Sequence, residues 1–393
     1  MTLEGYNDFM KLLALTFALL SPTLLLNSAQ ATPLEGTYIG SVGTAPVVAV
    51  FGAADAQFEN SYYYRKFGQD IQLEQREKNG QIVLTEFGPF PEQLKRATAT
   101  LKLEDGQLSG TYTLLKGGKP LPMTLKPVSS ADLKGPLSNP QLESWKKKSP
   151  YTFLKFDRKL EAGKFVSNSS TDGKMVLQTG KLSGVTYTWT TEPKSKISYP
   201  RLEGSIYQQV NSALEGHQLE VAANVLECNV TEPDHSFNFV PTLSFISAKL
   251  VSVTAAVDLY CGGAHPTTYT DTLTLELVSG KALELEDVYR FVPLPAGVNL
   301  KTFEPFEKYD AFVSARKKTL EPLIYAVRPD LKKNTDCYGP DTGIDSWKTL
   351  YWWLSNKGLV LESDFPHVAA ACTEAVTLPY ALLEKYRVSK LRP

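Results

Sequence analysis

The stretch IQLEQREKNGQIVLTE, residues 71–86, decides the fold of the N-terminal part of this chain. Two strand-like runs flank the dipeptide Asn79-Gly80, which strongly favours the two-residue turn of a β-hairpin. The same strand–turn–strand pattern recurs from Leu34 to about Lys126, with roughly eight short runs and no helical period. We therefore expect a small antiparallel β-barrel or β-sandwich at residues 32–127.

A different pattern follows the strand-rich segment. Residues 128–149 are punctuated by proline, serine, glycine and a lysine run, so we expect a linker there. From residue 150 to residue 393, strand patterns and helix patterns are grouped rather than strictly alternating. Grouping of this kind indicates an α+β domain with a mostly antiparallel sheet, and α+β is the fold class we predict.

Two helices stand out in this second domain. Apolar residues spaced four apart predict an amphipathic helix that ends at Gly216; they are Leu202, Ile206, Val210 and Leu214. A second helix is expected over residues 309–327, with a kink or break at Pro322.

The first 31 residues have the features of a secretory signal peptide. Lys11 precedes an apolar run at residues 12–20, and Ala29-Gln-Ala31 matches a small-residue cleavage site. We expect cleavage near Ala31 and a periplasmic or secreted mature protein. An uncleaved anchor helix is the alternative, although the run is shorter than the roughly 20 apolar residues of a membrane span.

All four cysteines follow the expected cleavage site, and an even number in an exported chain indicates disulfides. Three pairings are possible, and we favour the local one, Cys228 with Cys261 and Cys337 with Cys372. No C-x-x-C pair or Cys/His cluster has the spacing of metal ligands, so we expect no metal. No cofactor-binding motif stands out either, and we expect none.

The net charge of the chain bears on the class of its partners. The chain has 41 basic and 42 acidic residues, and removal of residues 1–31 leaves 40 of each. Without a basic excess, the bulk charge does not favour binding to nucleic acid or to an anionic membrane, although a local patch is compatible with it. We expect no membrane span in the mature chain.

The run Tyr260-Cys-Gly-Gly-Ala-His-Pro266 leads to a family resemblance. Together with Ser279-Gly-Lys281, residues 353–367 and Val376-Thr-Leu-Pro-Tyr380, it resembles the extracellular domain of RsiV-type lysozyme-sensing anti-sigma factors. It is also similar to the accessory domain of PdaC-type peptidoglycan deacetylases. The resemblance covers about residues 195–388. In the sensors this domain binds lysozyme, and in the deacetylases the chemistry belongs to a separate domain, so the resemblance implies binding.

The resemblance and the residues together give two candidate loops. In the first, Gly262 and Gly263 allow close approach of a partner to the backbone, and His265 offers a donor and an acceptor near neutral pH. In the second, Asp364 and His367 pair an acid with a histidine. Both loops are equally compatible with structural turns.

Aromatic residues give a third candidate. Trp352 and Trp353 follow Tyr351 in a predicted strand, so at least one ring faces outward and is suited to stack on a sugar or anchor a protein. Burial between sheet and helices is the alternative. His217 and His235 lie in polar stretches, where we expect solvated side chains.

We find no G-x-S-x-G nucleophile elbow in the sequence. Our main hypothesis is therefore a non-catalytic binding protein of the cell envelope, with a peptidoglycan fragment or a lysozyme-like protein as partner. One alternative is a periplasmic hydrolase with a site near His265 or His367. Another is a binder of small apolar ligands in the N-terminal β domain.

Overall fold

The computed structural model describes residues 34–52, 60–88, 94–136, 138–162, 165–166, 175–176, 179–228, 235–262, 265–300, 302–338 and 347–388. The expected signal peptide at residues 1–31 lies outside them, as does Gly263. Residues 34–393 belong to one compact unit.

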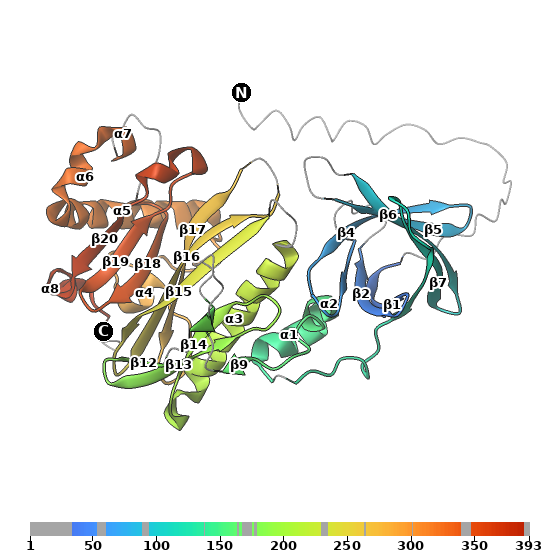
Figure 1. Cartoon of the computed structure of the whole chain (residues 1–393). Coiled ribbons are helices and arrows are strands. Elements are labelled where there is room, and N and C mark those ends of the chain that lie inside the picture. Colours follow the sequence, from blue (N-terminus) through green and yellow to red (C-terminus); the bar gives the residue numbers. More distant parts are fainter. Residues whose placement is uncertain are drawn as a thin grey trace. The chain divides into compact units, whose positions relative to one another are not determined.

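The N-terminal part is a closed antiparallel barrel of eight strands, in which β1 pairs with both β2 and β8 (Figure 1). The strands are β1 (Gly36–Val42), β2 (Ala45–Phe51), β3 (Ser61–Tyr64), β4 (Ile71–Lys78), β5 (Gln81–Phe87), β6 (Lys95–Glu104), β7 (Gln107–Leu114) and β8 (Leu121–Pro127). Asn79 and Gly80 both take positive φ, as the predicted two-residue hairpin turn requires. Of the two predicted architectures, the barrel is confirmed.

Side chains fill the interior of the barrel. The carboxylate of Glu86 lies inside and accepts hydrogen bonds from the hydroxyls of Tyr62 (2.7 Å) and Tyr112 (2.9 Å). The cavity beside these three residues measures about 10 Å³, which is room for about one water molecule. The interior therefore gives no support to the apolar-ligand alternative.

The segment expected to be a linker contains a helix. Asn139 caps α1 (Pro140–Lys148), and α2 (Pro150–Phe153) follows after one residue. Trp145 of α1 stacks on Phe156, with ring centroids 5.4 Å apart. The punctuation by proline and serine that indicated a linker marks the capped starts of these two helices, because proline is tolerated in the first helical turn.

The C-terminal part has the predicted α+β organisation, with antiparallel sheets and several helices (Figure 1). One sheet has the order β12-β13-β14 with β9 beside β13, and β10 and β11 pair separately. Two further sheets have the orders β15-β16-β17 and β18-β19-β20. The strands are β9 (Glu161–Ala162), β10 (Phe165–Val166), β11 (Met175–Val176), β12 (Thr179–Leu182), β13 (Val185–Thr191), β14 (Ser198–Leu202), β15 (Ser236–Ile246), β16 (Leu250–Tyr260), β17 (Thr267–Glu276), β18 (Leu350–Ser355), β19 (Gly358–Ser363) and β20 (Ala375–Pro379).

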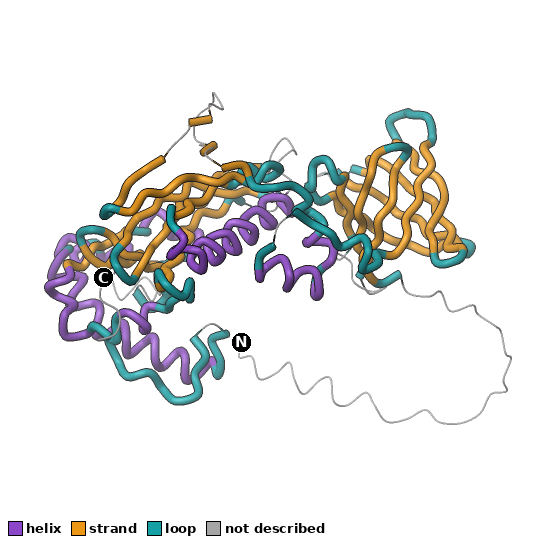
Figure 2. The backbone as a smooth tube through the Cα atoms, turned by 90° about the horizontal axis from the view of Figure 1, so that it is seen from below, coloured by secondary structure: helices purple, strands orange, loops and turns teal. Residues whose placement is uncertain are grey.

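Helices cover these sheets and form two apolar cores. The α-helices are α3 (Gln208–Cys228), α4 (Leu285–Val288), α5 (Phe306–Val327), α6 (Pro329–Lys333), α7 (Thr335–Tyr338) and α8 (Tyr380–Leu383), and short 3-10 turns are η2 (Ser205–Tyr207), η4 (His367–Cys372) and η5 (Glu384–Tyr386). Figure 2 shows a long helix lying along the strands, and α3 shares one core with β16 and β17. The second core joins β18–β20 to α5 and α8.

The first predicted helix was misplaced. Leu202 ends β14, Ile206 is exposed in η2, and α3 begins only at Gln208 and continues through Gly216 to Cys228. Glycine costs about 1 kcal/mol in a helix, but the apolar face that continues beyond Gly216 is buried and offsets that cost. The second helix begins at Phe306, and α5 continues through Pro322 instead of ending there.

Both predicted disulfides are present. Cys228 pairs with Cys261 and joins the end of α3 to the residue after β16, and Cys337 pairs with Cys372. The predicted local pairing, first cysteine with second and third with fourth, is therefore confirmed. Among the described residues, no helix combines the length and the apolar character needed to span a membrane.

A polar cluster, which we call the barrel clasp, ties β3 and the turn after it to α2 and the residues that follow; it comprises Tyr63, Asp70, Tyr151 and Lys155. Asp70 accepts hydrogen bonds from the Tyr151 hydroxyl and the Lys155 ammonium group, both at 2.7 Å. Tyr63 donates to the backbone oxygen of Tyr151 at 3.0 Å. The Lys155 side chain is only 3% exposed and that of Asp70 12%, so this ion pair is shielded from water.

Candidate functional site

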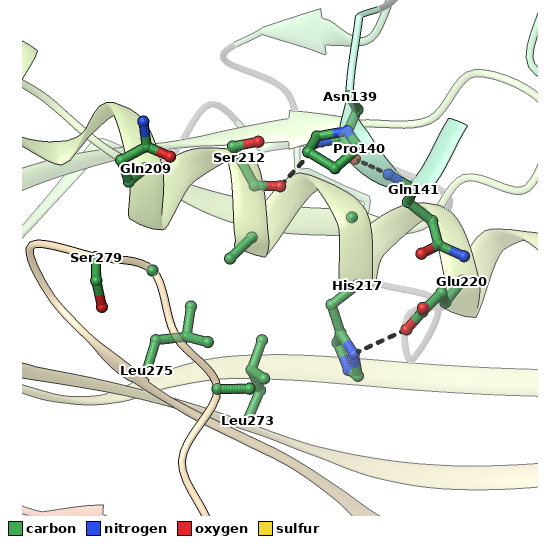
Figure 3. A pocket seen from close by; sticks show the side chains of 14 residues that line it. Asn139, Pro140, Gln141, Gln209, Ser212, His217, Glu220, Leu273, Leu275 and Ser279 are labelled. Atoms are coloured by element: carbon green, nitrogen blue, oxygen red, sulfur yellow. Dashed lines mark hydrogen bonds and ion pairs between the residues drawn. The ribbon is translucent and has the colours of Figure 1, made fainter. Parts of the chain in front are cut away.

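A pocket of about 370 Å³ opens where three separate segments of the chain meet (Figure 3). The start of α1, the first half of α3, and β17 with the turn after it supply the walls. The lining combines amide and hydroxyl groups with apolar side chains; it includes Asn139, Gln141, Gln209, Ser212, His217, Glu220, Leu273, Leu275 and Ser279. Its volume lies within the roughly 300–1,000 Å³ typical of small-ligand pockets.

Asn139 fixes two of these walls against each other. Its side-chain oxygen accepts from the backbone N–H of Gln141 (2.9 Å) and caps α1. Its side-chain nitrogen donates to the backbone oxygen of Ser212 in α3 (2.9 Å). Asn139 is buried, so one side chain both starts α1 and positions it beside α3.

The third wall, the turn after β17, lies so close to the start of α3 that only a glycine fits between them. Gly280, in the turn after β17, has φ of +68°, and a Cβ atom there would lie 2.5 Å from the backbone oxygen of Gln209. Only glycine takes this conformation without cost and leaves room for the neighbouring backbone. The turn and the start of α3 are therefore held at the distance that shapes the pocket.

His217 is the charged centre of the pocket. Its Nε2 lies 2.8 Å from Oδ2 of Asp271 on β17. Its Nδ1 lies 3.7 Å from Oε2 of Glu220, one turn further along α3 (Figure 3). Burial lowers the pKa of His217, but the hydrogen bonds and charges of Asp271 and Glu220 outweigh burial and raise the pKa to about 9. The imidazole is therefore a cation at neutral pH.

Neighbouring groups hold these two carboxylates. Tyr199 is fully buried beneath the ring of His217, and its hydroxyl donates to Asp271 at 3.5 Å. In the amide orientation that satisfies both of its partners, Gln141 donates to Glu220 at 3.2 Å and accepts from the indole of Trp145 at 3.1 Å. The charges are thus oriented before any ligand arrives.

This arrangement is suited to binding and poorly suited to general-base catalysis. A general base must be unprotonated, whereas His217 faces a carboxylate on each side and carries its proton at neutral pH. The cation of His217 with the two carboxylates of Asp271 and Glu220 gives the site one net negative charge. Amide, hydroxyl and charged groups around an apolar floor favour a polar ligand without strong negative charge. Among the described residues, no group of three or more His, Cys, Asp or Glu side chains is arranged to hold a metal ion.

The glycine–histidine loop predicted as a binding site lies elsewhere, between β16 and β17. His265 is exposed, and its Nδ1 lies 3.0 Å from the backbone oxygen of Pro266. Gly262 has φ of +84°, in keeping with a turn, and Gly263 is outside the described residues. His367 begins η4. Gly262 and His265 do not line the pocket at His217, and the function of Gly262, Gly263, His265 and His367 stays a prediction.

The two tryptophans do not share a face. Trp352 packs against the core of β18–β20, and Trp353 points to the opposite side of β18 with Tyr351. Asp364 is hydrogen-bonded to Tyr351, and burial, helped by Asp364 and Glu362, raises the pKa of Tyr351 to about 12. Burial also raises the pKa of Asp364 itself. Asp364, Glu362 and Tyr351 thus form a small acidic and aromatic group, and none of the three lines the pocket at His217.

Reading the sequence alone missed His217, which was expected to be solvated in a loop. The missed signal is the apolar spacing on both sides of Gly216, because Val221 and Val225 continue the helical period of Leu214. That spacing places His217 and Glu220 one turn apart on α3. His235 is also not simply solvated, because its Nδ1 lies 2.8 Å from the backbone oxygen of Cys228.

Comparison with known proteins gives little beyond structural likeness. No protein-family model and no curated protein matches the chain. The chain is similar to a solved DUF3298 family protein from Bacteroides fragilis, with 13% identity, a TM-score of 0.33, and coverage of 59% of this chain and 92% of that one. It is also similar to a DUF3298 family protein from Pseudomonas aeruginosa, with 15% identity, a TM-score of 0.31, and coverage of 60% and 95%. Similarity at this level assigns no function, and the resemblance to the RsiV-type and PdaC-type domains stays a prediction.

Proposed function

We propose that the protein is a non-catalytic binding protein of the cell envelope that holds a polar, glycan-containing fragment in the pocket at His217. The observation that carries this proposal is the partly buried His217 cation, fixed between two carboxylates at the wall of a pocket of about 370 Å³. A site organised in this way presents oriented donors and acceptors to hydroxyl and amide groups, which are the functional groups of cell-wall saccharides.

Two further observations support the cellular setting. Both disulfides require an oxidising environment to persist, and the N-terminal 31 residues have the pattern of a signal peptide. The resemblance to exported domains that meet lysozyme or peptidoglycan agrees with a ligand from the wall.

Calorimetry of the mature chain, residues 32–393, tests the proposal with three probes: soluble disaccharide-peptides from peptidoglycan, the disaccharide alone, and lysozyme. We expect saturable binding of both glycan probes. Binding of lysozyme alone would contradict the pocket as the binding site and favour a protein partner. No binding of any probe would overturn the proposed ligand class.

Two neighbouring residues on α3 give a matched pair of variants. Gln209 lines the pocket, whereas Gln208 is equally exposed and lies outside the lining. We expect Gln209→Trp to fill the pocket and weaken glycan binding at least about tenfold, while Gln208→Trp leaves it unchanged. Equal effects of the two substitutions would place the binding site elsewhere.

A further inference from the structure

One end of the barrel carries exposed leucines among cationic side chains. We call this surface the leucine–lysine rim and define it as residues 94–96, at the start of β6, and 114–121, from the end of β7 to the start of β8. Its leucines are exposed to an unusual degree; they are Leu94 (59%), Leu114 (47%), Leu115 (50%) and Leu121 (39%). Large apolar side chains gathered on one surface indicate an interaction site.

The rim is continuous across three neighbouring strands. Leu114 lies opposite Ala97 in the β6–β7 pair, and the backbone N–H of Leu115 donates to the oxygen of Arg96 at 2.9 Å. Leu121 lies opposite Tyr112 in the β7–β8 pair. The four leucines therefore belong to one surface and are not scattered over the barrel.

The charge of the rim has a single sign. Among its eleven residues, four are basic and none is acidic; the basic ones are Lys95, Arg96, Lys116 and Lys119. All four side chains are exposed. The turns at the opposite end of the barrel differ, because residues 77–80 and 104–106 contain three acidic residues and one lysine. The chain as a whole is nearly neutral, so this positive charge is local to the rim.

We propose that the leucine–lysine rim docks on an anionic phospholipid surface. Leucines that project from turns enter the boundary between headgroups and acyl chains, and the lysines around them meet lipid phosphates. Neither the leucines nor the cationic side chains suffice alone. The leucines contribute only burial of apolar surface, and the cations contribute only an attraction that salt screens. A partner that is both apolar and anionic at its surface matches the two together. This proposal is independent of the pocket at His217.

The test is cosedimentation of residues 32–393 with vesicles. The segment 1–31 is omitted because its apolar run would itself bind lipid, and residues 34–393 form one compact unit. We expect binding to vesicles of phosphatidylglycerol and phosphatidylcholine, weaker binding at high salt, and little binding to phosphatidylcholine alone. Absence of binding to the anionic vesicles, or equal binding to both kinds, would overturn the proposal.

A matched pair of double variants locates the docking surface. Leu115→Ser/Lys116→Glu changes the rim, and Lys102→Glu/Leu103→Ser makes the same two changes at the opposite end of β6, where Leu103 is 40% exposed. We expect the rim variant to lose at least about tenfold in vesicle binding and the control to lose little. Equal losses would refute the rim as the docking surface. A rim variant that instead dissociates a dimer in size-exclusion chromatography, with vesicle binding intact, would show that the rim binds a second copy of the chain.

Discussion

At the scale of single residues, His217 is a histidine whose charge is set by its surroundings. Asp271 reaches it from a strand and Glu220 from its own helix, so its protonation depends on the correct packing of α3 on β17. A group that is bound more tightly as a cation in the folded state couples protonation to stability.

The pH dependence of unfolding tests this coupling. The folded pKa of about 9 lies above the unfolded value of about 6.5, so the stabilisation is complete below pH 6.5 and is lost as the pH rises through 9. Between pH 6.5 and pH 10, we expect the wild type to lose up to about 3 kcal/mol more stability than His217→Gln, measured by urea unfolding. His265→Gln, at an exposed turn, serves as the control and should follow the wild type. A parallel pH profile for wild type and His217→Gln would show that the imidazole is not held as a cation.

At the scale of elements, the turn after β17 shapes the pocket through Gly280. Gly280 and Gly80 have the same φ of +68°, but a Cβ atom meets the Gln209 backbone at Gly280 and nothing within 4 Å at Gly80. Alanine at either position takes on a left-handed conformation that costs about 1 kcal/mol. We expect Gly80→Ala to cost about that much and Gly280→Ala at least about 1 kcal/mol more, measured by denaturant unfolding. Equal costs would mean that the turn moves away from α3 freely.

Elements with local signals could be predicted, and those defined by long-range contacts could not. The hairpin at Asn79-Gly80 carries its turn chemistry in two adjacent residues, and repetition of such signals indicated a small antiparallel barrel or sandwich. The disulfides also followed from neighbours in sequence. The site at His217 brings together residue 139 before α1, residues 209–220 of α3 and residue 271 of β17, and no local sequence pattern predicts that these segments are close in space. Gly216 added an error, because a glycine that usually ends a helix lies here within α3.

At the scale of the whole molecule, the barrel clasp joins segments far apart in the sequence through one shielded ion pair, Asp70 with Lys155. Removal of Lys155 leaves the shielded carboxylate of Asp70 with the neutral hydroxyl of Tyr151 as its one side-chain donor among the described residues. Loss of one partner of a buried pair costs about 3–5 kcal/mol, whereas loss of both charges costs less. We therefore expect Lys155→Met to destabilise the protein more than Asp70→Asn/Lys155→Met does, measured in a double-mutant cycle.

An exposed ion pair provides the comparison. Arg76 and Glu74 pair on the barrel surface, where the Arg76 side chain is 70% exposed. Arg76→Met should cost less than about 1 kcal/mol of folding stability.

Additive effects of the substitutions at Asp70 and Lys155 would show that the two residues do not act as a pair.

The connectivity of the disulfides has a consequence for how the molecule is made. The first cysteine is bonded to the second and the third to the fourth, with separations of 33 and 35 residues. A chain that enters an oxidising compartment with its N-terminus first exposes Cys228 and Cys261 before either later thiol arrives. We therefore expect oxidation in order of emergence to yield the native pairs directly, with an oxidant and without an isomerase to correct crossed bonds.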